Sequence, residues 1–343
     1  MKAIVFYQHG PLDVLQLADL PTPPVGPSDV LIDVKAAALN RLDLWVREGW
    51  PGLKLKLPHI SGSDAAGVVA AVGEAVTEFK PGQRVTVNPT LSCGECEYCF
   101  RGEDQMCLKH SLLGEFTSGT YAEQIVVPAR NVVALPDDTS FEEAAAANLI
   151  MVTAWHSLIR RGQLRAGETV LVVGAGGGVN IASIQIAKLA GARVLVVASN
   201  APKAEKARAL GADVVLDRSK DTDWSRAVFS LTNRRGVDVV VDNVGAATWL
   251  SSIRALARGG RMLVVGNTSG PKFEMDSRFM FAKHISIVGS TMGSHQDYRA
   301  VMNLVFQRKI KSVVDRVLPL SEAREAQRIL QEGDVFGKVV LKP

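Results

Sequence analysis

The stretch VLVVGAGGGVNIASIQIAKL, residues 170–189, decides the fold. Its first four residues form an apolar run typical of a buried β-strand, and residues 179–189 have the character of a helix. The turn between them carries four glycines that let a ligand approach the backbone closely: Gly174, Gly176, Gly177 and Gly178. A strand, a glycine turn and a helix in this order predict a cradle for the pyrophosphate of a dinucleotide.

Strands and helices continue to alternate after this turn. Helical patterns at Val179–Leu189 and Lys203–Leu210 separate the first strands. Further strands are predicted at Val194–Val197, Val214–Leu216, Val237–Val241, Met262–Val265 and Ile285–Val288. Alternation of this kind is typical of a doubly wound parallel sheet, so residues 151–289 are predicted to form a Rossmann dinucleotide-binding domain.

The end of the second strand bears on which dinucleotide binds. NAD sites usually place an Asp or Glu there to accept a hydrogen bond from the ribose 2′-hydroxyl. Residues 197–203 read VASNAPK and hold no acid, so the sequence favours NADP(H) over NAD(H). Asn180 departs from the small residue expected at the third position of the glycine fingerprint. The remaining predicted cofactor-binding residues are Val179, Ser199, Asn200, Lys203, Asn243 and Gly266.

The first half of the chain is rich in strands. They are expected at Val30–Ala36, Gly67–Val72, Arg84–Val87 and Tyr121–Val127. An alanine-rich helix should follow from Phe141 to near Arg161, and an amphipathic helix is predicted at Tyr298–Gln307. The last strand, Lys338–Leu341, should fold back onto the N-terminal domain. Residues 1–150 and 290–343 therefore form the second predicted domain.

All four cysteines of the chain fall within fifteen residues, at Cys93, Cys96, Cys99 and Cys107. Four thiolates on one short loop can surround a single tetrahedral zinc ion at about 2.3 Å. Two disulfides or an iron–sulfur cluster suit the expected compartment and the spacing less well. The sequence thus predicts one structural Zn²⁺ per chain in a lobe at residues 89–110. An all-sulfur site is closed to substrate, so the reaction must take place elsewhere.

Composition narrows the class of protein further. Hydrophobic residues make up 47% of the chain and charged residues 22%, with a formal net charge of +4. No apolar run approaches the roughly 20 residues that cross a bilayer. No cluster of lysine and arginine marks a nucleic-acid surface. Ala3–Tyr7 is expected to be a first strand and not a secretion signal, which makes the cytoplasm the expected compartment.

Several segments together resemble the medium-chain dehydrogenase/reductase superfamily. Besides the cysteine loop and the glycine turn, they are GSDAAGVVAAVG (62–73), KPGQRV (80–85), LGAD (210–213) and VDVVVDNVG (237–245). The resemblance covers essentially the whole chain. It implies an α/β fold with a GroES-like, partly β-barrel catalytic domain, a Rossmann domain and a cleft between them. It also implies a homodimer or homotetramer, with the edge strand near Ile285–Gly289 as a contact.

The catalytic zinc of the alcohol dehydrogenases in this superfamily has no ordinary ligands here. Its Cys, His and third-ligand positions are occupied by Asn40, Ser63 and Asn148, and the proton-relay positions by Leu42 and Trp45. Neutral amides and a hydroxyl are poor zinc ligands beside thiolate and imidazole. Asn40, Asp43 and the GSD segment resemble the quinone oxidoreductase branch, which binds NADPH and lacks catalytic zinc.

The sequence therefore predicts an NADP(H)-dependent oxidoreductase that reduces quinones or α,β-unsaturated carbonyls by direct hydride transfer. Asn40 would contact the acceptor, Asp43 would support Asn40, and Ser63 would line the cleft. One alternative is a zinc-dependent alcohol dehydrogenase with substitute ligands such as His59, Asp43 and Asp64. We expect instead that the two aspartates brace the site by hydrogen bonds to backbone. A second alternative is a non-enzymatic sensor that binds NADPH.

Overall fold

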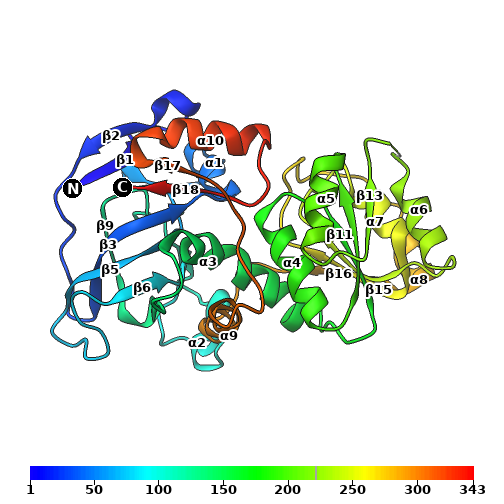
Figure 1. Cartoon of the computed structure of the whole chain (residues 1–343), viewed down its shortest axis with the longest axis horizontal. Coiled ribbons are helices and arrows are strands. Elements are labelled where there is room, and N and C mark those ends of the chain that lie inside the picture. The colour runs from blue at the N-terminus through cyan, green and yellow to red at the C-terminus, as the bar shows by residue number, and fades with distance from the viewer. Residues whose placement is uncertain (221) are drawn as a thin grey trace. The chain divides into compact units, whose positions relative to one another are not determined.

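The computed structural model describes residues 1–220 and 222–343 and divides into two compact units. A catalytic unit comprises Met1–Leu149 and Gly293–Pro343, and a Rossmann unit comprises Ile150–Met292. The boundaries expected from the sequence, after residues 150 and 289, lie one and three residues from these. Figure 1 shows the chain coloured from its N-terminus to its C-terminus.

The Rossmann unit is built on one parallel six-stranded sheet with the order β13-β12-β11-β14-β15-β16. Its strands are β11 (Thr169–Val173), β12 (Arg193–Ala198), β13 (Val214–Asp217), β14 (Val237–Asp242), β15 (Leu256–Val264) and β16 (Ser286–Gly289). Its helices are α4 (Gly178–Leu189), α5 (Ala201–Ala209), α6 (Trp224–Leu231), α7 (Trp249–Ala255) and α8 (Arg278–Lys283). This order and the parallel pairing confirm the doubly wound sheet.

Both faces of this sheet are covered by helices. In Figure 1, α4 and α5 lie on one side of the sheet, and α6 and α7 lie on the other. Residues 170–173 and 194–197 are at most 2% exposed, which explains why they are continuous runs of aliphatic residues. Strand β15 begins six residues before its predicted start, because Gly259 and Gly260 interrupt the apolar pattern that the prediction used.

The catalytic unit contains a seven-stranded sheet with the order β10-β6-β5-β3-β18-β17, in which β9 also pairs with β3. Its strands are β3 (Asp29–Ala38), β5 (Asp64–Val72), β6 (Arg84–Val87), β9 (Gln124–Pro128), β10 (Val132–Ala134), β17 (Val314–Pro319) and β18 (Lys338–Lys342). A second sheet joins β1 (Lys2–Phe6), β2 (Gln16–Asp19) and β4 (His59–Ile60), and a two-stranded ribbon joins β7 (Thr90–Leu91) and β8 (Ser111–Leu112).

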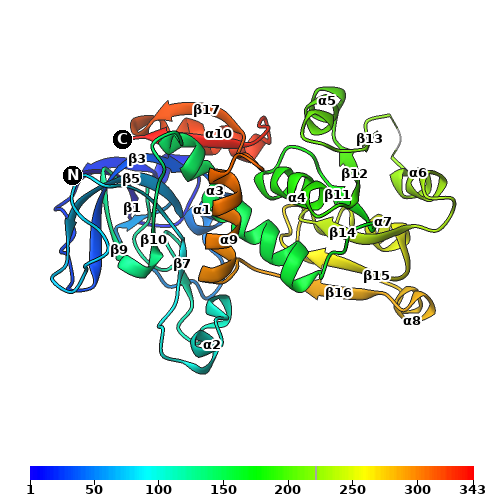
Figure 2. The ribbon, with the colours of Figure 1, turned by 60° about the horizontal axis from the view of Figure 1, so that its bottom comes forward.

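Helices complete this unit. They are α1 (Arg41–Glu48), α2 (Glu97–Phe100), α9 (His295–Phe306), α10 (Ala323–Glu332) and the first part of α3 (Phe141–Trp155), whose residues from Ile150 onward belong to the Rossmann unit. Short 3₁₀ turns lie at Leu12–Val14, Asp104–Met106, Ala129–Asn131 and Leu320–Glu322, and a π-helical segment, His156–Arg161, follows α3. The alanine-rich helix thus changes its winding over its last six residues. In Figure 2, α2 lies on a loop that projects from the body of this unit.

Two features of the catalytic unit bring distant segments to one place. Strand β18 pairs antiparallel with the end of β3, Val340 opposite Ala38, which confirms that the C-terminal tail folds back. Helix α3 packs its fully buried alanines 144–146 against Ala36 and Ala66 of the sheet. Because these side chains are small, the helix backbone approaches the strands closely. The ends of β3, β5, β18 and the middle of α3 therefore meet.

The predicted strand at Tyr121–Val127 is divided in the structure. Its first residues pair with β1, through the bridge between Ala122 and Ala3, and only Gln124–Pro128 joins β3.

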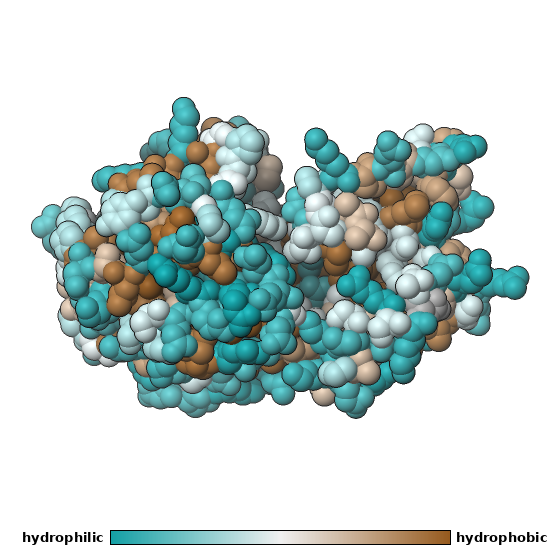
Figure 3. Space-filling model, turned by 90° about the horizontal axis from the view of Figure 1, so that it is seen from above, coloured by the Kyte–Doolittle hydropathy of each residue, from teal (hydrophilic) through white to brown (hydrophobic). Residues whose placement is uncertain are grey.

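Among the described residues, no helix is both long and apolar enough to cross a membrane. On the face shown in Figure 3, apolar side chains reach the surface in separate patches on each unit, among predominantly hydrophilic residues.

Candidate active site

Asn40 lies where β3 ends and α1 begins, and its side chain is held by two charged residues. Its Nδ2 donates to Asp64 Oδ2 at 2.9 Å, and Lys338 Nζ donates to its Oδ1 at 2.5 Å. Lys338 also donates to Asp64 Oδ2 at 3.0 Å. Asn40 is 7% exposed, Lys338 3% and Asp64 0%. The three side chains form a closed, buried hydrogen-bonded triad, which we call the Asn40 triad.

Asp43 supports Asn40 through the backbone and not through the amide. Its Oδ2 accepts from the backbone N–H of Asn40 at 2.7 Å and from the hydroxyl of Tyr121 at 2.6 Å. The other oxygen, Oδ1, is buried without a partner among the described atoms. Burial raises the pKa of Asp43 to about 6, although both hydrogen bonds act in the opposite direction. Asp43 thus fixes the start of α1, from which Asn40 projects.

Asp64 also makes the backbone contact that we expected of it. Its Oδ1 accepts from the backbone N–H of Leu149 in α3 at 2.9 Å. Together with the two bonds from the triad, this gives the carboxylate three donors, which compensates for its complete burial. His59 is a buried residue of β4 whose ring nitrogen Nε2 lies 3.1 Å from the carbonyl oxygen of Gly114. Its ring therefore serves the fold and not a metal site with Asp43 and Asp64.

Ser63 and Asn148 are committed to structural hydrogen bonds. Ser63 is fully buried, and its hydroxyl donates to the carbonyl oxygen of Leu113 at 2.7 Å. Asn148 Oδ1 accepts from the hydroxyls of Thr86 at 2.8 Å and Tyr298 at 2.6 Å. Its Nδ2 donates to the carbonyl oxygen of Ala65 at 2.9 Å. The side chains of Ser63 and Asn148 therefore hold α3 and the segment after β8 against β5. These contacts give no support to the predicted role of Ser63 as a residue that lines the substrate cleft.

The Asn40 triad is poorly suited to bind a second metal ion. A cation there would lie close to the buried ammonium of Lys338, which already occupies Asn40 Oδ1 and one oxygen of Asp64. The hydroxyl of Ser63 and the carbonyl of Asn148 are engaged elsewhere. Positive charge, neutral amides and a hydroxyl form a set that Zn²⁺ disfavours. The triad instead suits hydrogen bonding to a polar substrate atom.

The four cysteines form a separate cluster that fits a zinc ion. Their Sγ atoms all lie within 4.8 Å of one another, and neighbouring pairs are separated by 3.5, 3.6 and 3.9 Å. A tetrahedron with zinc–sulfur bonds of about 2.3 Å has edges of about 3.8 Å. The backbone N–H groups of Cys93 and Lys109 donate to Cys107 Sγ, as they would to a thiolate. The predicted ligand set is therefore brought together with the right dimensions.

The glycine turn is shaped by Asn180, the residue that departs from the fingerprint. Its Nδ2 donates to the carbonyl oxygen of Val173 at 2.7 Å, and its Oδ1 accepts from Asn243 Nδ2 at 3.2 Å. Gly174 has φ +101°, and a Cβ at Gly177 would lie 2.8 Å from Asn180 Oδ1. The side chain of Asn180 thus fills the space beneath the turn and ties the end of β11 to the end of β14.

Several groups around this turn fit a dinucleotide. Helix α4 begins at Gly178, so the N–H groups of Gly178 and Val179 lie in its first turn, where an anion is favoured. Asn243 Oδ1 is buried and has no partner among the described atoms, which leaves an acceptor for a bound group. A Cβ at Gly266 would lie 3.3 Å from the carbonyl oxygen of Asn243. These residues gather at the carboxyl edge of the sheet, where such ligands bind in open α/β folds.

The residues predicted to select the cofactor lie beyond the end of β12. Asn200 caps α5, since its Oδ1 accepts from the backbone N–H of Lys203 at 3.0 Å, so its amide has a structural function. Ser199 is half-buried beside it. The sequence prediction missed Arg218, an exposed residue whose backbone N–H donates to the carbonyl oxygen of Ala198 at 3.0 Å. This bond places Arg218 next to the end of β12, although twenty residues separate it from Ala198.

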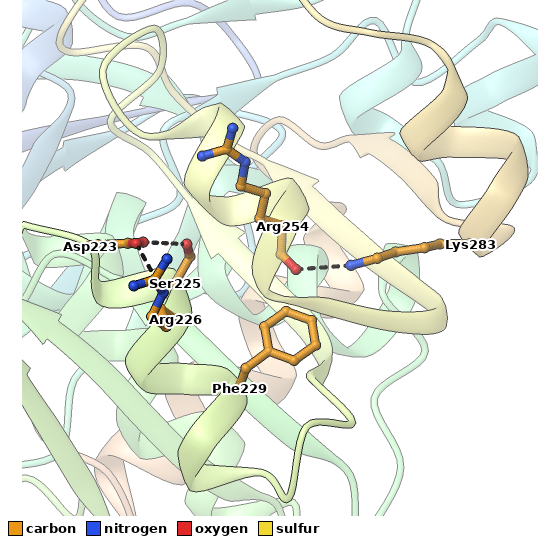
Figure 4. Close-up of a pocket in the computed structure, with 6 residues that line it drawn as sticks. All are labelled: Asp223, Ser225, Arg226, Phe229, Arg254 and Lys283. Atoms are coloured by element: carbon orange, nitrogen blue, oxygen red, sulfur yellow. Dashed lines mark hydrogen bonds and ion pairs between the residues drawn. The ribbon is translucent and has the colours of Figure 1, made fainter.

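Figure 4 shows a different hollow in the Rossmann unit, of about 390 Å³. It is lined by Asp223, Ser225, Arg226, Phe229, Arg254 and Lys283. Lys283 Nζ donates to the carbonyl oxygens of Arg254 and Leu256, both at 2.9 Å, and lies 5.0 Å from the centre of the Phe229 ring. Asp223 accepts from Ser225 and lies 3.6 Å from Arg226. These contacts stabilise the ends of α6 and α7, and the hollow includes none of the predicted cofactor residues.

Comparison with known proteins agrees with this geometry. Residues 26–137 match the alcohol dehydrogenase GroES-like domain, and residues 178–307 match the zinc-binding dehydrogenase domain. An acryloyl-coenzyme A reductase of Metallosphaera sedula is 34% identical over 99% of each chain. The chain belongs to the zinc-type medium-chain dehydrogenase/reductase family. It is accordingly an NAD(P)-dependent oxidoreductase, as expected, and the alternative of a non-enzymatic NADPH sensor is set aside.

Two solved structures show how widely the members of this medium-chain family differ. A structure titled NAD-dependent alcohol dehydrogenase is 46% identical, with a TM-score of 0.97 and full coverage of both chains. A quinone oxidoreductase from Pseudomonas syringae is 31% identical, with a TM-score of 0.84, and the match covers 100% of this chain and 99% of that one. The fold prediction is thereby confirmed, whereas the names of the relatives cover more than one reaction.

Proposed function

We propose that this protein is an NADP(H)-dependent reductase of α,β-unsaturated carbonyls or quinones that works without a catalytic metal. The observation that carries the proposal is the Asn40 triad. At the position where the alcohol dehydrogenases it resembles have a thiolate ligand, this chain has an amide fixed by a buried ammonium and carboxylate. Relatives named acryloyl-coenzyme A reductase and quinone oxidoreductase support this choice of substrate class.

The chemistry of the acceptor explains why such a site can suffice. NADPH, when bound, supplies a hydride, and a conjugated alkene or quinone is electrophilic enough to accept it without a strong Lewis acid. Negative charge then develops on the carbonyl oxygen, where a fixed hydrogen-bond donor stabilises it. Asn40 retains one N–H of its amide for this role, and Asp43 holds the backbone from which it projects. An unactivated alcohol must instead lose a proton as hydride leaves, which catalytic zinc promotes.

For the cofactor, we propose NADP(H). Ser199 and Lys203 follow β12 along the chain, and Arg218 lies beside its end. The acid Asp217, which lies opposite Ala198 on β13, is engaged with its own loop. Its Oδ1 accepts from the backbone N–H and the hydroxyl of Ser219, at 3.0 and 2.6 Å. One oxygen of that carboxylate is therefore engaged, and Arg218, which has no partner among the residues that the structure describes, can meet a 2′-phosphate. The protein is further proposed to be a homodimer or homotetramer, with the edge strand β16 as a contact.

The function is tested by following nicotinamide absorbance with probe substrates. NADPH should be consumed with menadione, but-3-en-2-one or acryloyl-coenzyme A as acceptor, and prior treatment with a mild chelator should not change the rate. NADP⁺ with ethanol or cyclohexanol should react at least about 10²-fold more slowly, since removal of one transition-state stabiliser alone costs about that much. Alcohol oxidation that exceeds enone and quinone reduction, and that the chelator abolishes, would refute the proposal.

Asn40 provides the matching variant. Asn40→Ala should lower kcat for the conjugated acceptor by about 10²-fold while NADPH binding stays within twofold, because only a contact made in the transition state is lost. Normal turnover by this variant would contradict the assigned contact. An alcohol dehydrogenase with substitute ligands remains the second candidate, favoured by the 46% identical structure of that name. That candidate requires a second metal ion whose removal abolishes activity and whose return restores it.

A further inference from the structure

Lys338 enters the Asn40 triad from the far end of the chain. It is the first residue of β18, and its Nζ lies 2.5 Å from Asn40 Oδ1 and 3.0 Å from Asp64 Oδ2. With 3% of its surface exposed, it is a rare case of a lysine buried in full. A charge in such a place is costly unless it is paired, and Asp64 provides the pair. The arrangement does more than balance charge, because the side-chain amide of Asn40 is hydrogen-bonded to both charged groups.

The charges of these neighbours decide which way the amide of Asn40 faces. An ammonium has donors and no acceptor, and a carboxylate without a proton has acceptors and no donor. The amide of Asn40 therefore satisfies both neighbours only with Oδ1 toward Lys338 and Nδ2 toward Asp64. The reversed amide would place its N–H₂ against the ammonium and its oxygen against the carboxylate. Lys338 thus determines the orientation and, by donating to Oδ1, also polarises the amide.

One consequence concerns the part of the amide that remains available. Nδ2 has two N–H bonds, and one is used by Asp64. The other has no partner among the described residues, and neither does the third N–H of the Lys338 ammonium. A polarised amide with its oxygen already occupied acts as a donor. It suits an oxygen that gains negative charge, and it does not suit a metal ion.

We propose that Lys338 is a positioning residue of the reductase: its ammonium fixes the amide of Asn40 so that it offers N–H to the carbonyl or quinone oxygen of the acceptor. This inference rests on the proposed function for its effect on catalysis, whereas the fixed orientation of the amide is independent of the substrate. Lys338 acts through Asn40 and need not touch the acceptor.

A double-mutant cycle separates this role from a merely structural one. In the wild type, Lys338→Met should lower kcat for menadione or but-3-en-2-one by roughly tenfold, with KM within twofold. In an Asn40→Ala background the same change should alter kcat by less than about twofold, because the group through which Lys338 acts is already gone. A tenfold loss in both backgrounds would overturn the proposal. Lys342→Met is the matched control, since this exposed lysine lies on the same strand and pairs with Glu142 at 2.7 Å.

Two further variants guard against a loss of folding. Lys338→Met leaves Asp64 buried without its partner, which can destabilise the protein strongly. The double variant Asp64→Asn, Lys338→Met removes both charges at once and should fold, yet it should show the same roughly tenfold loss in kcat. Lys338→Arg keeps the charge and should recover kcat to within about threefold of the wild type. Failure of Lys338→Arg to recover, together with wild-type activity in the double variant, would show that the charge is irrelevant.

A readout without turnover keeps this inference distinct from the proposed function. In protein labelled with ¹⁵N at asparagine, the side-chain amide signals of Asn40 are identified by their loss in Asn40→Ala. Their exchange with water should be slow in the wild type and in Lys338→Arg, and at least tenfold faster in Lys338→Met. Equal exchange in all three would overturn the role of Lys338. If exchange behaves as expected but no conjugated acceptor is reduced, the proposed function fails and the fixed amide stands.

Discussion

Asp43 gives a prediction whose size follows from the structure. Its carboxyl is fully buried, one oxygen has no partner among the described atoms, and its pKa is raised from 3.8 to about 6. Because the folded state holds the proton more tightly than the unfolded state, Asp43 contributes stability below pH 4. That contribution is lost as the pH rises through 6. Replacing the carboxyl by the neutral amide of Asn should remove this pH dependence.

The magnitude follows from the two pKa values. The difference between 3.8 and about 6 corresponds to about 3 kcal/mol of unfolding free energy in total. Roughly half of this, about 1–2 kcal/mol, is lost between pH 5 and pH 8. Thiolates bind zinc more firmly in this range than in stronger acid, so the zinc-loaded protein can be compared at both pH values. Over that range the wild type should lose about 1–2 kcal/mol of unfolding free energy relative to Asp43→Asn.

The assay is urea unfolding of the zinc-loaded wild type and Asp43→Asn at pH 5 and pH 8. The difference in unfolding free energy between the two proteins is taken at each pH, and the two differences are then compared. Asp19→Asn is the control, since this carboxylate is exposed on β2 and its variant should follow the wild type. The reasoning would be refuted if the stability difference between the two proteins were the same at both pH values. It would also be refuted if the wild type became more stable relative to Asp43→Asn as the pH rises, because the pKa of Asp43 would then be lowered.

Four other outcomes are expected. Asn180→Ala should weaken NADPH binding roughly tenfold, measured by fluorescence titration. It should also lower the unfolding free energy by about 1–3 kcal/mol, measured by urea unfolding, because the carbonyl of Val173 and the amide of Asn243 lose their hydrogen-bond partner. Arg218→Ala should weaken NADPH binding at least tenfold while leaving NADH binding within twofold, and an equal effect on both would exclude contact with a 2′-phosphate. Ser199→Asp should shift kcat/KM toward NADH by repelling that phosphate, and unchanged selectivity would contradict its placement. Cys96→Ser should lower the zinc content below one ion per chain and reduce the melting temperature, and full retention of zinc would exclude Cys96 as a ligand.

Local patterns made much of this architecture predictable. The cysteine spacing specified a ligand set because all four thiols lie on one short loop, and their Sγ atoms do converge within 4.8 Å. The glycine turn and the aliphatic runs specified a parallel sheet because both of its faces are buried. The return of the C-terminal strand was also predicted. These features depend on neighbours in sequence or on simple periodicity.

The content of the candidate active site was less accessible, because it depends on contacts between distant residues. Lys338 is 298 positions from Asn40, and nothing in its own surroundings distinguishes it from an exposed strand lysine such as Lys342. Arg218 reaches the end of β12 only through the pairing of β12 with β13. Ser63 precedes Asp64 of the Asn40 triad, yet the direction of its hydroxyl toward Leu113 depends on packing that no local pattern encodes.

The central claim is that the protein holds one structural zinc and catalyses reduction without a second metal. The most direct measurement is the zinc content per chain in protein purified without added metal, before and after mild chelation, with NADPH-dependent menadione reduction followed in the same samples. The account predicts one tightly held zinc and activity that chelation does not change. Two zinc ions per chain, one of them removed by the chelator together with activity, would contradict it and identify the protein as a zinc-dependent alcohol dehydrogenase.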